Sequence, residues 1–248
     1  MIRSNLGAAH LRAAALSTAI VALAAASALA GTTPTVFIPA ASSVGPVTGT
    51  PGTGLPGQIW LPLSTGNLAA NLTYAASNTA NATFLASSVD YPRDGQNSNV
   101  GDPLSSFLGN DAASVVGINP ATTPSGPLLI RLAGMLAFSV TGTFTIGVGS
   151  DDGFDLRLGD TNVSRFDGDR PFTYTYASIN ITQPGLYPID LFYWANNSTF
   201  SGLELVWDID DNAAFDPITV PTANLYIPAP SAAGALALVG LVATRRRR

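Results

Sequence analysis

Apolar and polar residues alternate along much of this chain, most regularly in its second half. Phe144, Ile146 and Val148 are separated by single Thr or Gly residues, which is the period of two expected for a strand with one buried face. Short strands separated by Gly, Asp and Pro residues predict an all-β fold, an antiparallel β-sandwich or barrel. The strands predicted in this way are Leu128–Leu132, Met135–Val140, Thr143–Val148, Phe154–Leu158, Phe172–Ile181, Leu186–Trp194 and Leu203–Ile209.

The region before these strands is less regular. Residues 31–56 are rich in Thr, Pro, Ser and Gly and carry no charge, which predicts a low-complexity lead, either flexible or forming an irregular edge strand. Apolar alternation starts at about residue 57, so we expect one sandwich domain over 57–226. Residues 68–84 lack a clear helical period, and residues 90–110 are dense in Gly, Asn, Asp and Ser, as in a long loop. We therefore expect no strong helix in the domain.

Both ends of the chain carry targeting patterns. Residues 1–30 combine a short basic start, an apolar run and small residues before Gly31, the layout of a cleavable signal peptide. Near the other end, residues 232–244 are apolar and Arg245–Arg248 follow. A helix of that length spans about 20 Å, whereas crossing a bilayer takes roughly 20 residues. Residues 227–248 are thus expected to form a marginal anchor with its arginines on the cytoplasmic side.

This tail resembles the PEP-CTERM sorting signal, in which a proline-flanked motif precedes a short hydrophobic helix and an arginine cluster. The motif here is Pro228-Ala229-Pro230, with Ala229 where that family usually has Glu, so the site of processing stays open. The resemblance implies export by a bacterium of Gram-negative type, transient membrane contact through residues 232–244, and processing by an exosortase. It also implies a final place on the cell surface or in the extracellular matrix. The alternative is a plain C-terminal anchor.

Charge and composition narrow the range of partners. The chain has 16 acidic and 11 basic residues and a net charge of −5, and the two ends hold six of its arginines. The region between them is therefore strongly acidic, which disfavours nucleic acid and anionic lipid as partners. The acidic surface suits divalent cations or neutral ligands, or it serves solubility alone.

Several catalytic residue types are missing. The chain has no Cys, and its one His, His10, lies in the expected signal peptide. Ser-His-Asp and Cys-His catalysis and imidazole or thiolate metal sites are thereby excluded from the domain. Paired carboxylates remain available for acid–base chemistry, but Glu204 lies in an alternating strand, where we expect a solvated outer-face position. The composition therefore argues against an enzyme.

Asp151 and Asp152 are the main candidates for chemistry. They lie between two alternating runs, which predicts a hairpin with both carboxylates at its tip. Neighbouring side chains on a regular strand point to opposite faces, so gripping one ion would require a kink in the backbone. The alternative is a tight turn, which Asp and Gly favour without any ligand.

The strands and this motif together resemble the PA-14 domain, which takes its name from the anthrax protective antigen. The resemblance covers roughly residues 128–207. The matching segments are Ile130–Gly134, Gly142–Ile146, Ser150–Gly153, Leu156–Leu158, Pro184–Ile189 and Leu203–Trp207. It implies a β-sandwich of a kind found in adhesins, in toxins and as accessory modules of carbohydrate-active enzymes.

The resemblance also implies a site. Sugar-binding members of the family hold Ca²⁺ with paired aspartates joined by a cis peptide and with an asparagine from a later loop. Here these residues correspond to Asp151, Asp152 and either Asn196 or Asn197. Two carboxylates and an amide leave part of the six to eight oxygen positions of Ca²⁺ open, and backbone carbonyls, water or sugar hydroxyls would fill them.

Aromatic residues near this site are candidates for stacking on a sugar. We consider Trp60, Trp194 and Phe200, of which Trp194 adjoins the asparagine loop. Two other acidic segments are weaker candidates. Residues 208–212 lack the Gly and Glu of a Ca²⁺ loop and are expected to be solvated, and residues 166–170 are expected to form a turn.

The sequence thus favours an exported, non-catalytic surface or matrix protein that binds carbohydrate with calcium. One alternative is a purely structural surface protein whose Asp-Asp turn binds nothing. Another is an accessory fragment of a carbohydrate-active enzyme.

Overall fold

The computed structural model describes residues 34–47, 52–61, 67–93, 97–196, 199–209 and 215–227. The expected signal peptide and the sorting tail from residue 228 onward lie outside these residues. Within the described residues, no helix is both long enough and apolar enough to cross a membrane.

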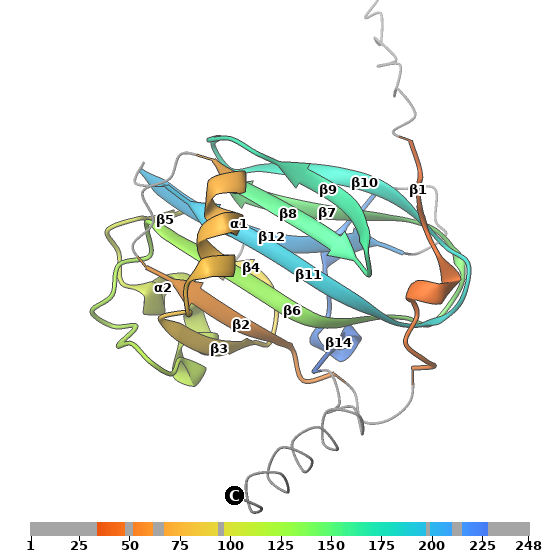
Figure 1. Ribbon diagram of the computed structural model, residues 1–248, viewed down its shortest axis with the longest axis horizontal. Coiled ribbons are helices and arrows are strands. Elements are labelled where there is room, and N and C mark those ends of the chain that lie inside the picture. Colours follow the sequence, from red (N-terminus) through yellow and green to blue (C-terminus); the bar gives the residue numbers. More distant parts are fainter. Residues whose placement is uncertain are drawn as a thin grey trace, which may run out of the picture. The chain divides into compact units, whose positions relative to one another are not determined.

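Two β-sheets form the domain, which confirms the predicted all-β sandwich (Figure 1). In the first sheet, β1 pairs in parallel with β10, and the remaining pairs are antiparallel. Two short strands, β4 and β5, also pair with β12. In order across the sheet, the strands are β1 (Val36–Ile38), β10 (Thr173–Ile181), β7 (Gly142–Asp151), β12 (Phe200–Asp208) and β13 (Ile218–Thr219), with β4 (Asp90–Tyr91) and β5 (Ser98–Asn99) beside β12.

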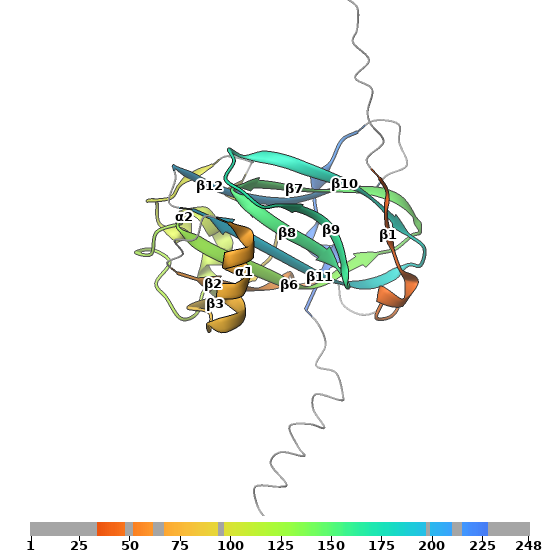
Figure 2. The same cartoon turned by 45° about the horizontal axis from the view of Figure 1, so that its top comes forward.

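The second sheet is antiparallel throughout and lies against the first, as the turned view in Figure 2 also shows. Its order is β3 (Ala82–Ala86), β2 (Leu55–Trp60), β6 (Leu128–Phe138), β11 (Gly185–Ala195), β8 (Gly153–Leu158) and β9 (Thr161–Phe166), with β14 (Leu225–Tyr226) beside β6. Strands far apart in the sequence are therefore neighbours, so the register depends on long-range contacts.

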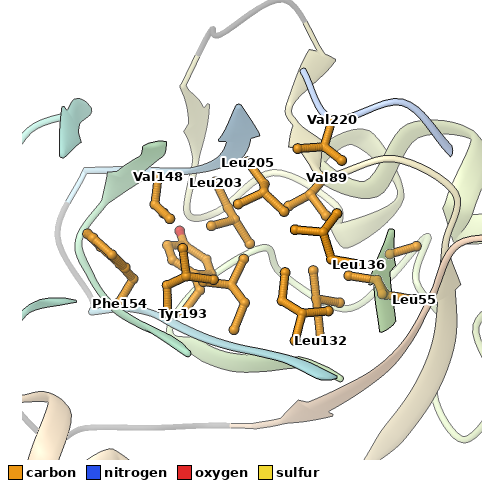
Figure 3. Packing of buried hydrophobic residues seen from close by; sticks show 14 of the residues in the cluster. Leu55, Val89, Leu132, Leu136, Val148, Phe154, Tyr193, Leu203, Leu205 and Val220 are labelled. Atoms are coloured by element: carbon orange, nitrogen blue, oxygen red, sulfur yellow. The ribbon is translucent and has the colours of Figure 1, made fainter. Parts of the chain in front are cut away.

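The core lies between the sheets and is built from alternate strand residues, as the period of two predicts. Figure 3 shows Val148 of β7 and Leu203 and Leu205 of β12 facing Phe154 of β8 and Tyr193 of β11. All five side chains are fully buried. Inward-facing apolar residues from both sheets thus fix which face of each strand is turned to solvent.

One strand is longer than predicted. The sequence predicted separate strands at residues 128–132 and 135–140, but β6 is continuous through Gly134 and pairs with β11 along its whole length. A Cβ atom at Gly134 would lie 2.6 Å from Leu55 Cδ2 and 2.8 Å from the Tyr226 carbonyl oxygen. The glycine therefore permits a close approach of chains and does not mark a turn.

The prediction that the domain has no strong helix was wrong. Helix α1 (Leu68–Ser77) begins at Asn67, whose side chain accepts a hydrogen bond from the Ala70 amide at 2.9 Å. It lies over β8 and β11 in both views (Figures 1 and 2). A second helix, α2 (Leu104–Leu108), falls in the region expected to be a loop. Three short 3₁₀ turns complete the described structure: η1 (Ala40–Ser42), η3 (Gly109–Ser114) and η4 (Thr222–Asn224).

Candidate functional site

Asp151 and Asp152 lie where the chain crosses from one sheet to the other. Asp151 ends β7 in the first sheet, opposite Gly202 of β12, and Gly153 starts β8 in the second sheet, opposite Trp194 of β11. The predicted hairpin is therefore wrong, because β7 and β8 belong to different sheets. The peptide bond between the two aspartates is cis, and their exposed fractions are 4% and 2%.

Backbone amides from two other segments hold the carboxylate of Asp152. The Asn196 amide donates to Oδ2 at 2.8 Å, and the Arg170 amide donates to Oδ1 at 3.2 Å. The structure thus brings Asp152 into direct contact with the loop after β11, through the backbone amide of Asn196. Asn197 lies outside the described residues.

Tyr193 fixes the backbone beneath the pair. Its buried hydroxyl donates to the Asp151 carbonyl oxygen at 2.6 Å and accepts from the Gly202 amide at 3.0 Å. Because Tyr193 belongs to the second sheet and Gly202 to the first, this hydroxyl joins both sheets at the crossing point. The position of the two aspartates is therefore defined by buried hydrogen bonds.

Arg170 is the cation nearest to the aspartates in the described structure of this site. Its guanidinium donates to the Ser150 carbonyl oxygen at 3.2 Å, to Ser150 Oγ at 2.8 Å and to Thr175 Oγ1 at 2.7 Å. It also lies over the Phe166 ring, 4.3 Å from the centroid. These contacts anchor the positive charge beside the carboxylates, where burial lowers the arginine pKa and the two aspartates raise it.

Burial leaves the two carboxylates short of compensating charge. Desolvation, followed by the charge of Asp152, raises the pKa of Asp151 to about 7, against the opposing effects of the Phe172 amide and Arg170. Desolvation also raises the pKa of Asp152, although the amides of Asn196 and Arg170 favour its charged form. Two adjacent anions with one nearby guanidinium therefore form a site that a further cation would stabilise.

The pair borders an open hollow of about 360 Å³. Phe200, 41% exposed, contributes an aromatic ring to its lining. The lining residues are Asp151, Asp152, Asp169, Arg170, Pro171, Asn196, Thr199 and Phe200. The hollow thus combines carboxylates, an amide, a hydroxyl and one exposed ring.

The donors at this hollow suit a hard cation. Carboxylate and amide oxygens are ligands that Ca²⁺ prefers, and none of the residues that line the hollow is a Cys, Met or His. In the described part of the chain, no three Asp, Glu, His or Cys side chains gather closely enough to hold a metal. A cation here would therefore depend on the two aspartates, with neutral oxygens or solvent filling the other positions.

Trp60 and Trp194 do not line the hollow, where a ring that stacks on a sugar was expected. Trp194 is 1% exposed and packs with Trp60, Leu68 and Leu129 in a second apolar cluster, and it does not line the hollow. Trp60 is also buried, and its Nε1 donates to the Asn78 carbonyl oxygen at 2.9 Å. Phe200 is thus the ring that the structure places at the site.

Two residues of the site were not predicted from the sequence, and the position predicted for one acidic residue was wrong. Asp169 and Arg170 line the hollow, although the sequence suggested only a turn there. The available signal was a lone arginine in an acidic loop. Glu204, expected to be solvated, is 8% exposed, because Tyr174 Oη donates to its Oε2 and Thr219 Oγ1 donates to its Oε1.

Comparison with solved structures supports the fold. No family model matches the sequence, and no curated protein sequence is significantly similar to it. Among solved structures, the PA14 domain of the MpAFP antifreeze protein superposes with a TM-score of 0.60 at 22% identity, covering 72% of this chain and 92% of that domain. The PA14 sugar-binding domain of an RTX adhesin gives a TM-score of 0.57 at 20% identity, covering 71% and 99%.

A third similar structure is the A domain of epithelial adhesin 6 from Candida glabrata, solved in complex with Galβ1-3GlcNAc. It superposes with a TM-score of 0.53 at 14% identity, covering 77% of this chain and 94% of that domain. All three similarities extend over most of the neighbour's length. The two-sheet sandwich of this protein is therefore a PA14-like fold.

Proposed function

We propose that this protein is an exported, non-catalytic module that binds carbohydrate with the help of calcium at the Asp151–Asp152 hollow. The observation that carries the proposal is the pair of adjacent, buried carboxylates on an open hollow, with pKa values raised by burial. The structural neighbours include a domain described as sugar-binding and an adhesin solved with a disaccharide. They support carbohydrate as the ligand class.

In this proposal, Asp151 and Asp152 hold the cation, and the Asn196 and Arg170 amides orient the Asp152 carboxylate. Asn197 is proposed as a further oxygen donor. Bound Ca²⁺ supplies coordination positions that sugar hydroxyls can fill. Phe200 offers a partly exposed ring for the apolar face of a sugar.

Arg170 also contributes to the proposed site. Its guanidinium donates hydrogen bonds to Ser150 and Thr175, which hold the positive charge beside the aspartates. It offsets part of their repulsion and leaves the hollow net negative. The site can therefore attract a divalent cation and still fold without one.

Binding to a panel of immobilised neutral glycans tests the function. We expect the wild type to bind some of them in Ca²⁺ and to lose that binding in a chelator. The double variant Asp151→Asn/Asp152→Asn should bind none, because both anionic ligands are gone. Asp160→Asn, which removes an exposed acid from the turn between β8 and β9, should bind as the wild type does. Glycan binding that persists in chelator would contradict a calcium-dependent site.

The proposal includes export and processing. The residue 1–30 pattern supports removal of a signal peptide, and the 228–248 pattern supports exosortase processing at the cell surface or matrix. The intact mass of protein recovered from cells should correspond to a chain without either end. A mass that still includes Arg245–Arg248 would contradict processing of the tail.

A further inference from the structure

A row of aromatic side chains lies on the outer face of the first sheet. Phe172, Tyr174, Tyr176 and Phe215 follow one another with ring centroids 5.4, 5.6 and 4.9 Å apart. Along β10, Ala177, Ile179 and Ile181 are buried in the core, so the alternate residues Tyr174 and Tyr176 face outward. We call these four residues the aromatic row.

Glycines in the neighbouring strands allow three of these rings, Phe172, Tyr174 and Tyr176, to approach the sheet closely. A Cβ atom at Gly147 would be 2.5 Å from Tyr176, and one at Gly149 would be 2.6 Å from Phe172 and 2.8 Å from Tyr174. Phe172, Tyr174 and Tyr176 therefore pack closely on β7. Tyr174 and Tyr176 remain partly exposed.

The row begins at the Asp151–Asp152 hollow. Gly202 lies directly opposite Asp151 in the β7–β12 ladder, and a Cβ atom at Gly202 would be 2.7 Å from the Phe172 ring. The Phe172 backbone amide also donates a hydrogen bond to the Asp151 carboxylate, and this bond favours the charged form of the carboxylate. Phe172, which follows the lining residue Pro171 in the sequence, thus places the row next to the hollow.

Acidic groups flank the row. Glu204 accepts a hydrogen bond from the Tyr174 hydroxyl. It lies directly opposite Asp90 in the β12–β4 ladder, so both carboxylates lie on the same face of the sheet. Such a surface repels anionic polymers such as uronate or sulfated chains. Partly exposed tyrosine rings on an acidic face suit a neutral sugar chain, whose rings have apolar faces that can stack on aromatic side chains.

We propose that the ligand is a neutral oligosaccharide chain, of which one unit occupies the hollow and the following units lie along the aromatic row. This inference rests on the proposed carbohydrate function and extends it to the length and charge of the ligand. The alternative role for the row is purely structural, with the rings shielding the glycine backbone of β7 and β12.

Calorimetric titration with sugars of different length distinguishes a ligand-binding role of the aromatic row from a purely structural one. The probes are glucose, galactose and N-acetylglucosamine and a neutral linear tetrasaccharide of each, all in Ca²⁺. We expect the wild type to bind a tetrasaccharide at least about tenfold more tightly than its monosaccharide, since each stacked ring adds affinity. A uronic-acid tetrasaccharide should bind more weakly than the neutral one.

The matched variants are Tyr176→Leu, which keeps an apolar side chain over Gly147, and Phe37→Leu, which removes an exposed ring from β1. Tyr176→Leu should lose most of the tetrasaccharide advantage and leave monosaccharide affinity unchanged, whereas Phe37→Leu should change neither. Calcium-dependent monosaccharide binding without a tetrasaccharide advantage would overturn this extension alone. If the wild type binds none of these sugars, the proposed function fails with it.

Discussion

In calcium-free buffer at pH 8, Asp151→Asn should be more stable than the wild type, by up to about 4 kcal/mol. Burial and the neighbouring Asp152 raise the pKa of Asp151 from 3.8 to about 7 in the folded protein. Between about pH 4 and pH 7, Asp151 therefore keeps its proton in the folded state but has lost it in the unfolded state. The free energy of unfolding falls as the pH rises through this range. Each pKa unit corresponds to about 1.4 kcal/mol, and Asn removes the charge at nearly constant shape.

Denaturant unfolding at pH 8 and near pH 4 measures this effect. The advantage of Asp151→Asn should be largest at pH 8 and should shrink toward pH 4, where the wild-type carboxyl is protonated in the folded state. Asp160→Asn removes one charge from an exposed position and should differ little from the wild type at either pH. If Asp151→Asn and the wild type unfold alike at pH 8, the carboxylates are not short of compensating charge.

Replacing Arg170 by Ala should have the opposite effect and destabilise the calcium-free protein by about 3–5 kcal/mol at pH 8. The variant loses the hydrogen bonds to Ser150 and Thr175 and leaves two buried carboxylates without their neighbouring cation. The loss should be smaller near pH 4, because protonated carboxyls no longer need the positive charge.

Arg165→Ala is the matched control for this arginine. Arg165 pairs with Asp167 at 2.9 Å, but their side chains are 39% and 60% exposed, so the pair should contribute no more than about 1 kcal/mol. Both variants are compared with the wild type by denaturant unfolding at the two pH values. An equal loss in Arg170→Ala at both pH values would mean that packing and hydrogen bonds, rather than charge, explain its role.

The sequence predicted the fold class because each strand buries one face, and that requirement leaves a period of two in the residues themselves. It failed at β6 and at the Asp151–Asp152 crossing for a different reason. A glycine that permits close approach, such as Gly134, looks like a turn signal. Likewise, the alternation on either side of the aspartates is the same whether the two strands pair or enter different sheets.

The helix and the charged contacts were hidden because their partners are distant in the sequence. Helix α1 packs through Leu68 against Trp60, Leu129 and Trp194, which come from three other segments. Glu204 is likewise buried by residues of other strands. The aspartates were visible as a motif, whereas their amide donors and Arg170 became identifiable only once the chain crossing was in place.

Calorimetric titration of the purified protein with Ca²⁺ tests the central claim, that the Asp151–Asp152 hollow is a cation site, most directly. We expect one Ca²⁺ to bind per wild-type chain at pH 8, no binding to Asp151→Asn/Asp152→Asn, and wild-type binding to Asp160→Asn. Calcium should also raise the melting temperature of the wild type, because it binds only the folded state. Identical titrations for the wild type and the double variant would contradict the site and favour a purely structural role for the two aspartates.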